Sequence, residues 1–122
     1  MKAGAIAAMP AALIGAASQP NEIDLRRIAR RLTGRVRYRY VAPEVRPLAG
    51  GYQIVAPCCS RNIDAAGGVI DIARIEYDEA ERRWNLYYKD HASDCWSLFI
   101  HSQRLERVMD SLNEDPLRVF WQ

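Results

Sequence analysis

Residues 69–100 read VIDIARIEYDEAERRWNLYYKDHASDCWSLFI, and this stretch decides the fold. It contains three short apolar runs separated by two polar breaks, Asp78–Glu81 and Asp90–Asp94. Large apolar side chains occupy alternate positions in the second and third runs, which is the period of a strand with one buried face. The breaks are short and acidic, as in exposed hairpin connections. The stretch therefore predicts an antiparallel β-meander.

The same alternation predicts which side chains of the meander are buried. We expect Trp84 and Leu86 of the second run, and Trp96 and Leu98 of the third, to face one core. If Leu98 is buried, replacing it with alanine costs about 2–5 kcal/mol. Two amphipathic helices would supply the other half of this core, through Leu25, Ile28, Leu32, Leu105, Val108, Met109 and Leu112.

Both helices have recognisable ends. The first has Asn21 as a predicted N-cap and Asp24 in its first turn, and it ends at Thr33-Gly34. The second has Ser102 as its predicted N-cap and stops at Asp115-Pro116, because proline cannot continue a helix. The apolar stripe of the first helix consists of Leu25, Ile28, Ala29 and Leu32, and the opposite arc of Arg26, Arg27, Arg30 and Arg31.

Two further strands are predicted between the first helix and the meander. Basic residues alternate with apolar or aromatic residues through residues 35–41. A strand would therefore place Val36, Tyr38 and Tyr40 on one side and Arg35, Arg37 and Arg39 on the other. Pro43 and Pro47 mark the end of this strand, Gly50-Gly51 forms a turn, and 52–56 is the next strand.

The predicted element order is therefore α-β-β-β-β-β-α. Two amphipathic helices and an antiparallel sheet imply a two-layer α+β fold. In this fold a β-meander sheet of about five strands is flanked by an N-terminal and a C-terminal helix.

The chain of 122 residues is long enough for one hydrophobic core. We expect residues 1–20 to be a poorly ordered N-terminal extension or a weak leader, and residues 21–122 to be a single α+β domain. The apolar run 3–17 is too short to span a membrane. Three cysteines, two of them adjacent, favour a reducing compartment and hence the cytoplasm. Export is the alternative, if the N-terminal run is a signal.

The charge is distributed unevenly along the chain. Residues 1–50 contain nine Lys or Arg and three Asp or Glu. Residues 51–122 contain eight Lys or Arg and twelve Asp or Glu. A basic face of this kind can bind the phosphates of a nucleic acid or another polyanion. It is also typical of a solvated surface whose charges are paired internally. The candidate polyanion-binding residues are Arg26, Arg27, Arg30, Arg31, Arg35, Arg37 and Arg39.

One long loop, residues 57–68, has no helix or strand period, and loops of this length in a compact domain are usually functional or disordered. Its candidate residues are Cys58, Cys59, Ser60, Arg61 and Asn62, because a guanidinium near a thiol favours the reactive thiolate. The spacing of the cysteines and histidines does not match a structural zinc site, so we predict no metal and no cofactor. No catalytic residue is assigned.

The C-terminal half resembles a known family. The residues that carry the resemblance are Ile70–Tyr77, Arg83–Tyr88, Trp96, Asp115-Pro116 and Phe120-Trp121. In these the chain resembles a family of small bacterial proteins known only as a domain of unknown function, with the resemblance strongest from Ile70 to Gln122. The resemblance implies a shared fold and a bacterial origin, and it implies no activity.

These observations predict an uncharacterised small protein that acts as a non-catalytic binding module. The leading partner is a nucleic acid or another polyanion, and a protein is the other partner class. The alternative is a thiol- or metal-dependent activity centred on the loop Cys58–Asn62. We also expect Phe120 and Trp121 to pack back on the domain, since an exposed aromatic tail would add nothing to folding.

Overall fold

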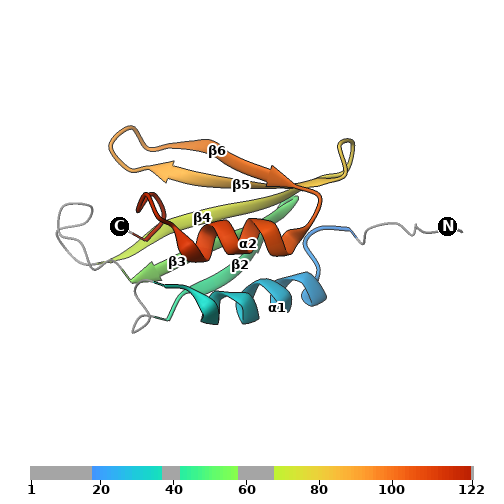
Figure 1. Cartoon of the computed structure of the whole chain (residues 1–122), viewed down its shortest axis with the longest axis horizontal. Coiled ribbons are helices and arrows are strands. Elements are labelled where there is room, and N and C mark those ends of the chain that lie inside the picture. Colours follow the sequence, from blue (N-terminus) through green and yellow to red (C-terminus); the bar gives the residue numbers. More distant parts are fainter. Residues whose placement is uncertain (1–17, 37–41, 58–67, 122) are drawn as a thin grey trace, which may run out of the picture.

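The computed structural model describes residues 18–36, 42–57 and 68–121. Within them, two helices cover one face of a five-stranded antiparallel sheet (Figure 1). The helix α1 spans Glu22–Arg31 and continues into a 3₁₀-helix, η1, at Leu32–Gly34, and α2 spans Leu105–Glu114. The predicted two-layer α+β fold, with one helix before the sheet and one after it, is confirmed.

The sheet is a meander in which each strand pairs with the next one along the chain. Its order is β2-β3-β4-β5-β6, and all four pairings are antiparallel. The polar breaks predicted as hairpin connections are turns, at residues 79–82 and 91–94. The strands are β2 at Glu44–Leu48, β3 at Gly51–Pro57, β4 at Val69–Asp78, β5 at Arg83–Asp90 and β6 at Cys95–Ser102.

The strand predicted at residues 35–41 is only partly described, and β2 was not predicted as a separate strand. Arg35 and Val36 are not in a strand, and the rest of that predicted strand, residues 37–41, lies outside the described residues. The strand β2 includes Pro47, which was expected to lie beyond the strand end. Within the described residues β2 pairs only with β3, so one side of its backbone needs no hydrogen-bond donor and proline is tolerated there.

The N-cap of α1 and the end of α2 are as predicted, whereas the start of α2 differs. Asn21 caps α1 as predicted, since its side-chain oxygen accepts the backbone N–H of Asp24 at 2.8 Å. Asp115, in the left-handed conformation with φ 37°, ends α2 before Pro116. Ser102, however, is the last residue of β6 and not the N-cap of α2. Its hydroxyl instead accepts the backbone N–H of Arg104, which occupies the cap position.

The core lies between the helices and the sheet. The predicted helix residues Ile28, Leu32, Leu105, Val108, Met109 and Leu112 are buried there together with Trp84 and Leu86 of β5. Leu25 is partly buried against the same cluster. Ala29, assigned to the apolar stripe of α1, is exposed. The strands β3 and β4 complete the cluster with Tyr52, Ile54, Ala56, Ile72, Ala73 and Ile75.

The prediction that Trp96 and Leu98 face this core is wrong. Leu86 pairs with Ile100, but Tyr87 pairs with Leu98, so the register skips Phe99. A bulge of this kind adds one residue to a strand and reverses its alternation at that point. Ile100 therefore points to the core with Leu86, whereas Leu98 lies on the opposite side of the sheet and is 47% exposed.

The C-terminal tail packs on the domain, as predicted. Phe120 and Trp121 are each only 1% exposed and belong to the core cluster. The indole N–H of Trp121 donates a hydrogen bond of 2.9 Å to the carbonyl oxygen of Leu112 in α2. The ring of Phe120 meets those of Tyr88 and Phe99 edge to face, so the tail joins α2 to the last two strands.

Candidate functional site

The predicted arginine face of α1 is largely paired with carboxylates. Arg26 forms an ion pair of 2.9 Å with Glu22, and both side chains are well exposed. Arg27 lies between two carboxylates, Asp24 at 2.7 Å and Glu106 at 2.8 Å. Burial alone would lower the pKa of Arg27, but hydrogen bonds to Asp24 and Glu106 outweigh it and raise the pKa. This guanidinium is therefore held firmly in its charged form.

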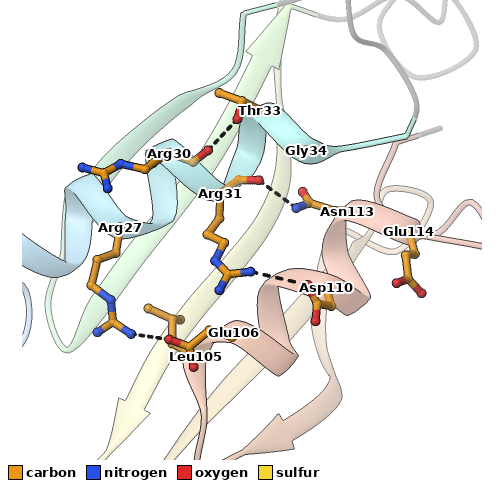
Figure 2. Close-up of a pocket in the computed structure, with 10 residues that line it drawn as sticks. All are labelled: Arg27, Arg30, Arg31, Thr33, Gly34, Leu105, Glu106, Asp110, Asn113 and Glu114. Carbon is orange, nitrogen blue, oxygen red and sulfur yellow. Dashed lines mark hydrogen bonds and ion pairs between the residues drawn. The ribbon is translucent and has the colours of Figure 1, made fainter.

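A groove of about 510 Å³ separates α1 from α2 (Figure 2). Two arginines of α1 reach across it: Arg27 meets Glu106, and Arg31 approaches Asp110 at 3.8 Å. Arg30 extends away from α2, and its guanidinium has no ion-pair partner within residues 18–36, 42–57 and 68–121. These two ion pairs across the groove connect α1 to α2. The guanidinium of Arg30 does not contribute to this connection.

Of the other three predicted arginines, Arg35 alone is described, and it is not part of this surface. Arg35 is buried at 8% exposure, donates a hydrogen bond to the carbonyl oxygen of Leu32, and has its guanidinium 5.5 Å from the ring centre of Trp121. Arg37 and Arg39 lie outside the described residues. The structure thus brings Arg26, Arg27, Arg30 and Arg31 together on α1 and turns Arg35 inward.

The candidate thiol loop, Cys58–Asn62, also lies outside the described residues. Cys95 is an exposed free thiol at the start of β6. Among the residues that the structure describes, no three His, Cys, Asp or Glu side chains are grouped as a metal site would require. No described helix is long and apolar enough to cross a membrane.

A second surface is the sheet face that the helices leave uncovered. Core residues such as Ile54, Ile75 and Leu86 point to the helices, so the residues that alternate with them point to the other side. The strand register places one outward side chain from each strand in a single row across the sheet. In order from β2 to β6, this row is Arg46, Gln53, Arg74, Tyr87 and Leu98.

Trp96, on the edge strand β6, lies on this open face. It pairs with Lys89 of β5, whose ammonium nitrogen is 5.3 Å from the indole ring centre. The guanidinium of Arg74 is 5.5 Å from the same ring, although Arg74 is on β4. The indole of Trp96 therefore reaches from the edge of the sheet across β5 toward β4. Two cation–π contacts hold the ring in this position.

The cations beside Trp96 are themselves held by carboxylates. Lys89 pairs with Asp94 at 2.8 Å and with Asp71 at 3.0 Å, and hydrogen bonds to these two groups raise its pKa. Arg74 pairs with Glu76 at 2.9 Å. Gln53 donates a further hydrogen bond to Asp71. The polar side chains around the indole are thus fixed by one another before any partner arrives.

The amide oxygen of Asn85 is one of the buried polar atoms on this face that lack a hydrogen-bond partner within the described residues. The outward side chain of Asn85 is paired in register with Glu76 and His101, and the residue is 8% exposed. Its amide oxygen accepts no hydrogen bond within the described part of the chain. A buried polar atom without a partner costs free energy, so this oxygen is a ready acceptor for a group that binds beside it.

Trp96 and Tyr87 were not among the candidate residues from the sequence. Strict alternation placed Trp96 in the core, and only the bulge at Phe99 moves it to the open face. A sequence signal for the bulge exists, because Leu98, Phe99 and Ile100 are three consecutive apolar residues, which a regular one-faced strand does not have.

Comparison with known proteins identifies the family and nothing more specific. No curated protein and no solved structure matches the chain. A family model described as a domain of unknown function, DUF3024, matches residues 16–122. The bacterial origin that the resemblance implied stays a prediction. With a match over almost its whole length, the chain belongs to the DUF3024 family.

Proposed function

We propose that the protein is a non-catalytic binding module that holds a short single-stranded nucleic acid on the open face of its sheet. The observation that carries this proposal is the position of Trp96, with Arg74 and Lys89 beside its ring and neither helix covering it. Tyr87 lies next to Arg74 in the outward row and supplies a second aromatic ring.

This arrangement suits unpaired bases. Proteins that bind single strands often stack the bases on aromatic rings or on the planar guanidinium groups of arginines exposed on a sheet. Cationic side chains nearby contact the phosphates of the backbone. The unpartnered amide oxygen of Asn85 can accept a hydrogen bond from a base amino group. A duplex offers no free base faces, so we expect single strands to be preferred.

The charge of the open face predicts how such binding depends on salt. In the ion pairs of this face within the described residues, three cations meet four carboxylates, so electrostatic attraction to phosphate is weak, and stacking supplies most of the affinity. The affinity should therefore fall only gently with salt. The charged residues are Arg46, Arg74, Lys89, Glu44, Asp71, Glu76 and Asp94.

The test measures binding of labelled oligothymidine and oligouridine by fluorescence anisotropy at low salt. Because stacking contributes about 1–3 kcal/mol per base, Trp96→Ala should weaken binding about 5- to 150-fold. Trp96→Phe should recover part of the loss, since it keeps an aromatic face. The matched control is Ile23→Ala, which truncates an exposed apolar residue on α1. Absence of binding, or equal binding by Trp96→Ala, would overturn the proposal.

A second candidate is polyanion binding by α1, because Arg26 and Arg30 are exposed one helical turn apart and Arg30 lacks an ion-pair partner in the described structure. Each phosphate contact on a duplex adds about −0.9 to the slope of log affinity against log salt. Replacing Arg26 and Arg30 with Gln should thus flatten that slope by about 1.8. Arg27 and Arg31 are poor test sites, since they also connect α1 to α2.

The thiol- or metal-dependent alternative and the cytoplasmic location stay predictions. Stoichiometric zinc in the purified protein, or fast alkylation of Cys58 or Cys59 near neutral pH, would favour the alternative. If the thiols are idle, the variant with Cys58→Ser and Cys59→Ser folds and binds oligonucleotide as the parent does.

A further inference from the structure

The sheet formed by the described strands has two edge strands, β2 and β6, and they differ in how they are protected. An unpaired edge exposes backbone donors and acceptors that attract another strand, and proteins block it with proline, charge or a covering element. The edge at β2 has all three: Pro47, the ion pair between Glu44 and Arg46, and α1 lying beside it (Figure 1).

The edge at β6 has far less protection. Its sequence, CWSLFIHS, contains no proline, lysine, arginine, aspartate or glutamate. It pairs with β5 alone within the described sheet, and neither helix overlies its outer edge (Figure 1). Leu98 is 47% exposed and Cys95 is exposed, so apolar surface accompanies the free backbone edge. Only the bulge at Phe99 interrupts the strand.

We infer that β6 pairs antiparallel with β6 of a second copy of this chain. A strand without formal charge meets its own copy without like-charge repulsion, which makes it self-complementary. The two-fold axis of such a pairing is perpendicular to the sheet, so both helical layers lie on one side and both open faces on the other. The pairing creates a continuous sheet of ten strands from the two copies.

The bulge and the side-chain directions fix the register. Directly opposite residues in an antiparallel pair point to the same face, and symmetry pairs positions whose numbers have a constant sum. Trp96 and Leu98 share the open face, so Trp96 of one copy lies opposite Leu98 of the other, with Ser97 opposite itself at the axis. This register pairs Cys95 through Phe99, and the bulge at Phe99 ends the pairing before Asp94 would meet Ile100.

Sedimentation equilibrium over a range of concentrations tests the inference. The intact chain should approach twice its mass of 13.9 kDa at high concentration. Leu98→Lys should be monomeric, because two lysines would then enter the interface. The matched control Ile23→Lys adds the same charge at an exposed apolar residue of α1 and should remain dimeric. A chain that is monomeric at every concentration, or a dimer that survives Leu98→Lys, would overturn the inference.

Cross-linking tests the register directly. In a chain whose own cysteines are replaced by serine, Ser97→Cys should form a covalent dimer with a short bifunctional thiol reagent, because the two side chains lie opposite one another. Gln103→Cys, an exposed position just past β6, is the control and should not cross-link. Cross-linking at Gln103 in preference to Ser97 would contradict this pairing.

Discussion

The carboxylate of Asp115 accepts the backbone N–H of Trp121 at 2.8 Å, so the residue that ends α2 also fixes the C-terminal tail. The same carboxylate accepts the backbone N–H groups of Val119 and Phe120 at 2.8 and 3.1 Å. Asp115 is 1% exposed, so its hydrogen bonds with these three backbone N–H groups lie largely out of contact with solvent. Tail and helix should therefore unfold together.

Asp115→Ala should lower the free energy of unfolding by about 2–4 kcal/mol, because it leaves buried N–H groups without an acceptor. Alanine also strains the left-handed backbone at this position, where φ is 37°. Asp115→Asn should cost less, since asparagine tolerates that conformation and keeps one acceptor oxygen. Urea unfolding followed by tryptophan fluorescence measures both. An unchanged midpoint for Asp115→Ala would mean that the tail is not held by this carboxylate.

Truncation of Leu86 should lower the free energy of unfolding far more than truncation of Leu98. Leu86 is fully buried, so Leu86→Ala should cost about 2–5 kcal/mol, whereas Leu98→Ala should cost under about 1 kcal/mol in the monomer because the side chain is half exposed. Urea unfolding at low protein concentration gives both values. A large loss for Leu98→Ala in a monomeric sample would place this side chain in the core and contradict the bulge at Phe99.

Asp24 should make stability depend on acid pH. Burial raises the pKa of Asp24, but hydrogen bonds from Gln19, Asn21 and Arg27 outweigh it and hold the pKa below its ordinary value of 3.8. A carboxylate with a depressed pKa in the folded state stabilises the fold fully above its ordinary pKa. That stabilisation is lost as the pH falls through the folded value, because the unfolded chain takes up the proton more readily.

The measurement is the unfolding temperature of the parent and of Asp24→Asn between about pH 7 and about pH 2. Asp24→Asn should lower the unfolding temperature at neutral pH and should flatten its decline below about pH 4. Glu22→Gln is the control, because Glu22 is exposed on the same helical turn. Parallel pH profiles for the parent and Asp24→Asn would show that Asp24 does not contribute to acid unfolding.

The elements that depend on neighbouring residues in the chain could be predicted from the sequence. The cap at Asn21, the helix stop at Asp115 and the turns of the meander rest on interactions within a few residues. The strand β2 was not predicted because Pro47 indicates a strand end, and proline is acceptable within a strand only where that strand lies at an edge. The sequence does not say which strand is the edge.

The candidate surfaces required the tertiary structure. The arginines of α1 were predicted correctly as facing away from its apolar stripe, but Arg27 meets Glu106, which is 79 residues further along the chain. Only the packing of α1 beside α2 brings these charges together. A long guanidinium side chain can reach several partners, and helix periodicity does not choose among them.

The sequence by itself determined the two-layer fold, both helices, the meander and the burial of the aromatic tail, because hydrophobic period and turn chemistry are local and repeat over many residues. The tertiary structure decided which face Trp96 occupies, which arginines are neutralised and which sheet edge stays open. A single bulged residue reverses the direction of the side chains on one side of it, and its position depends on the pairing of β6 with β5.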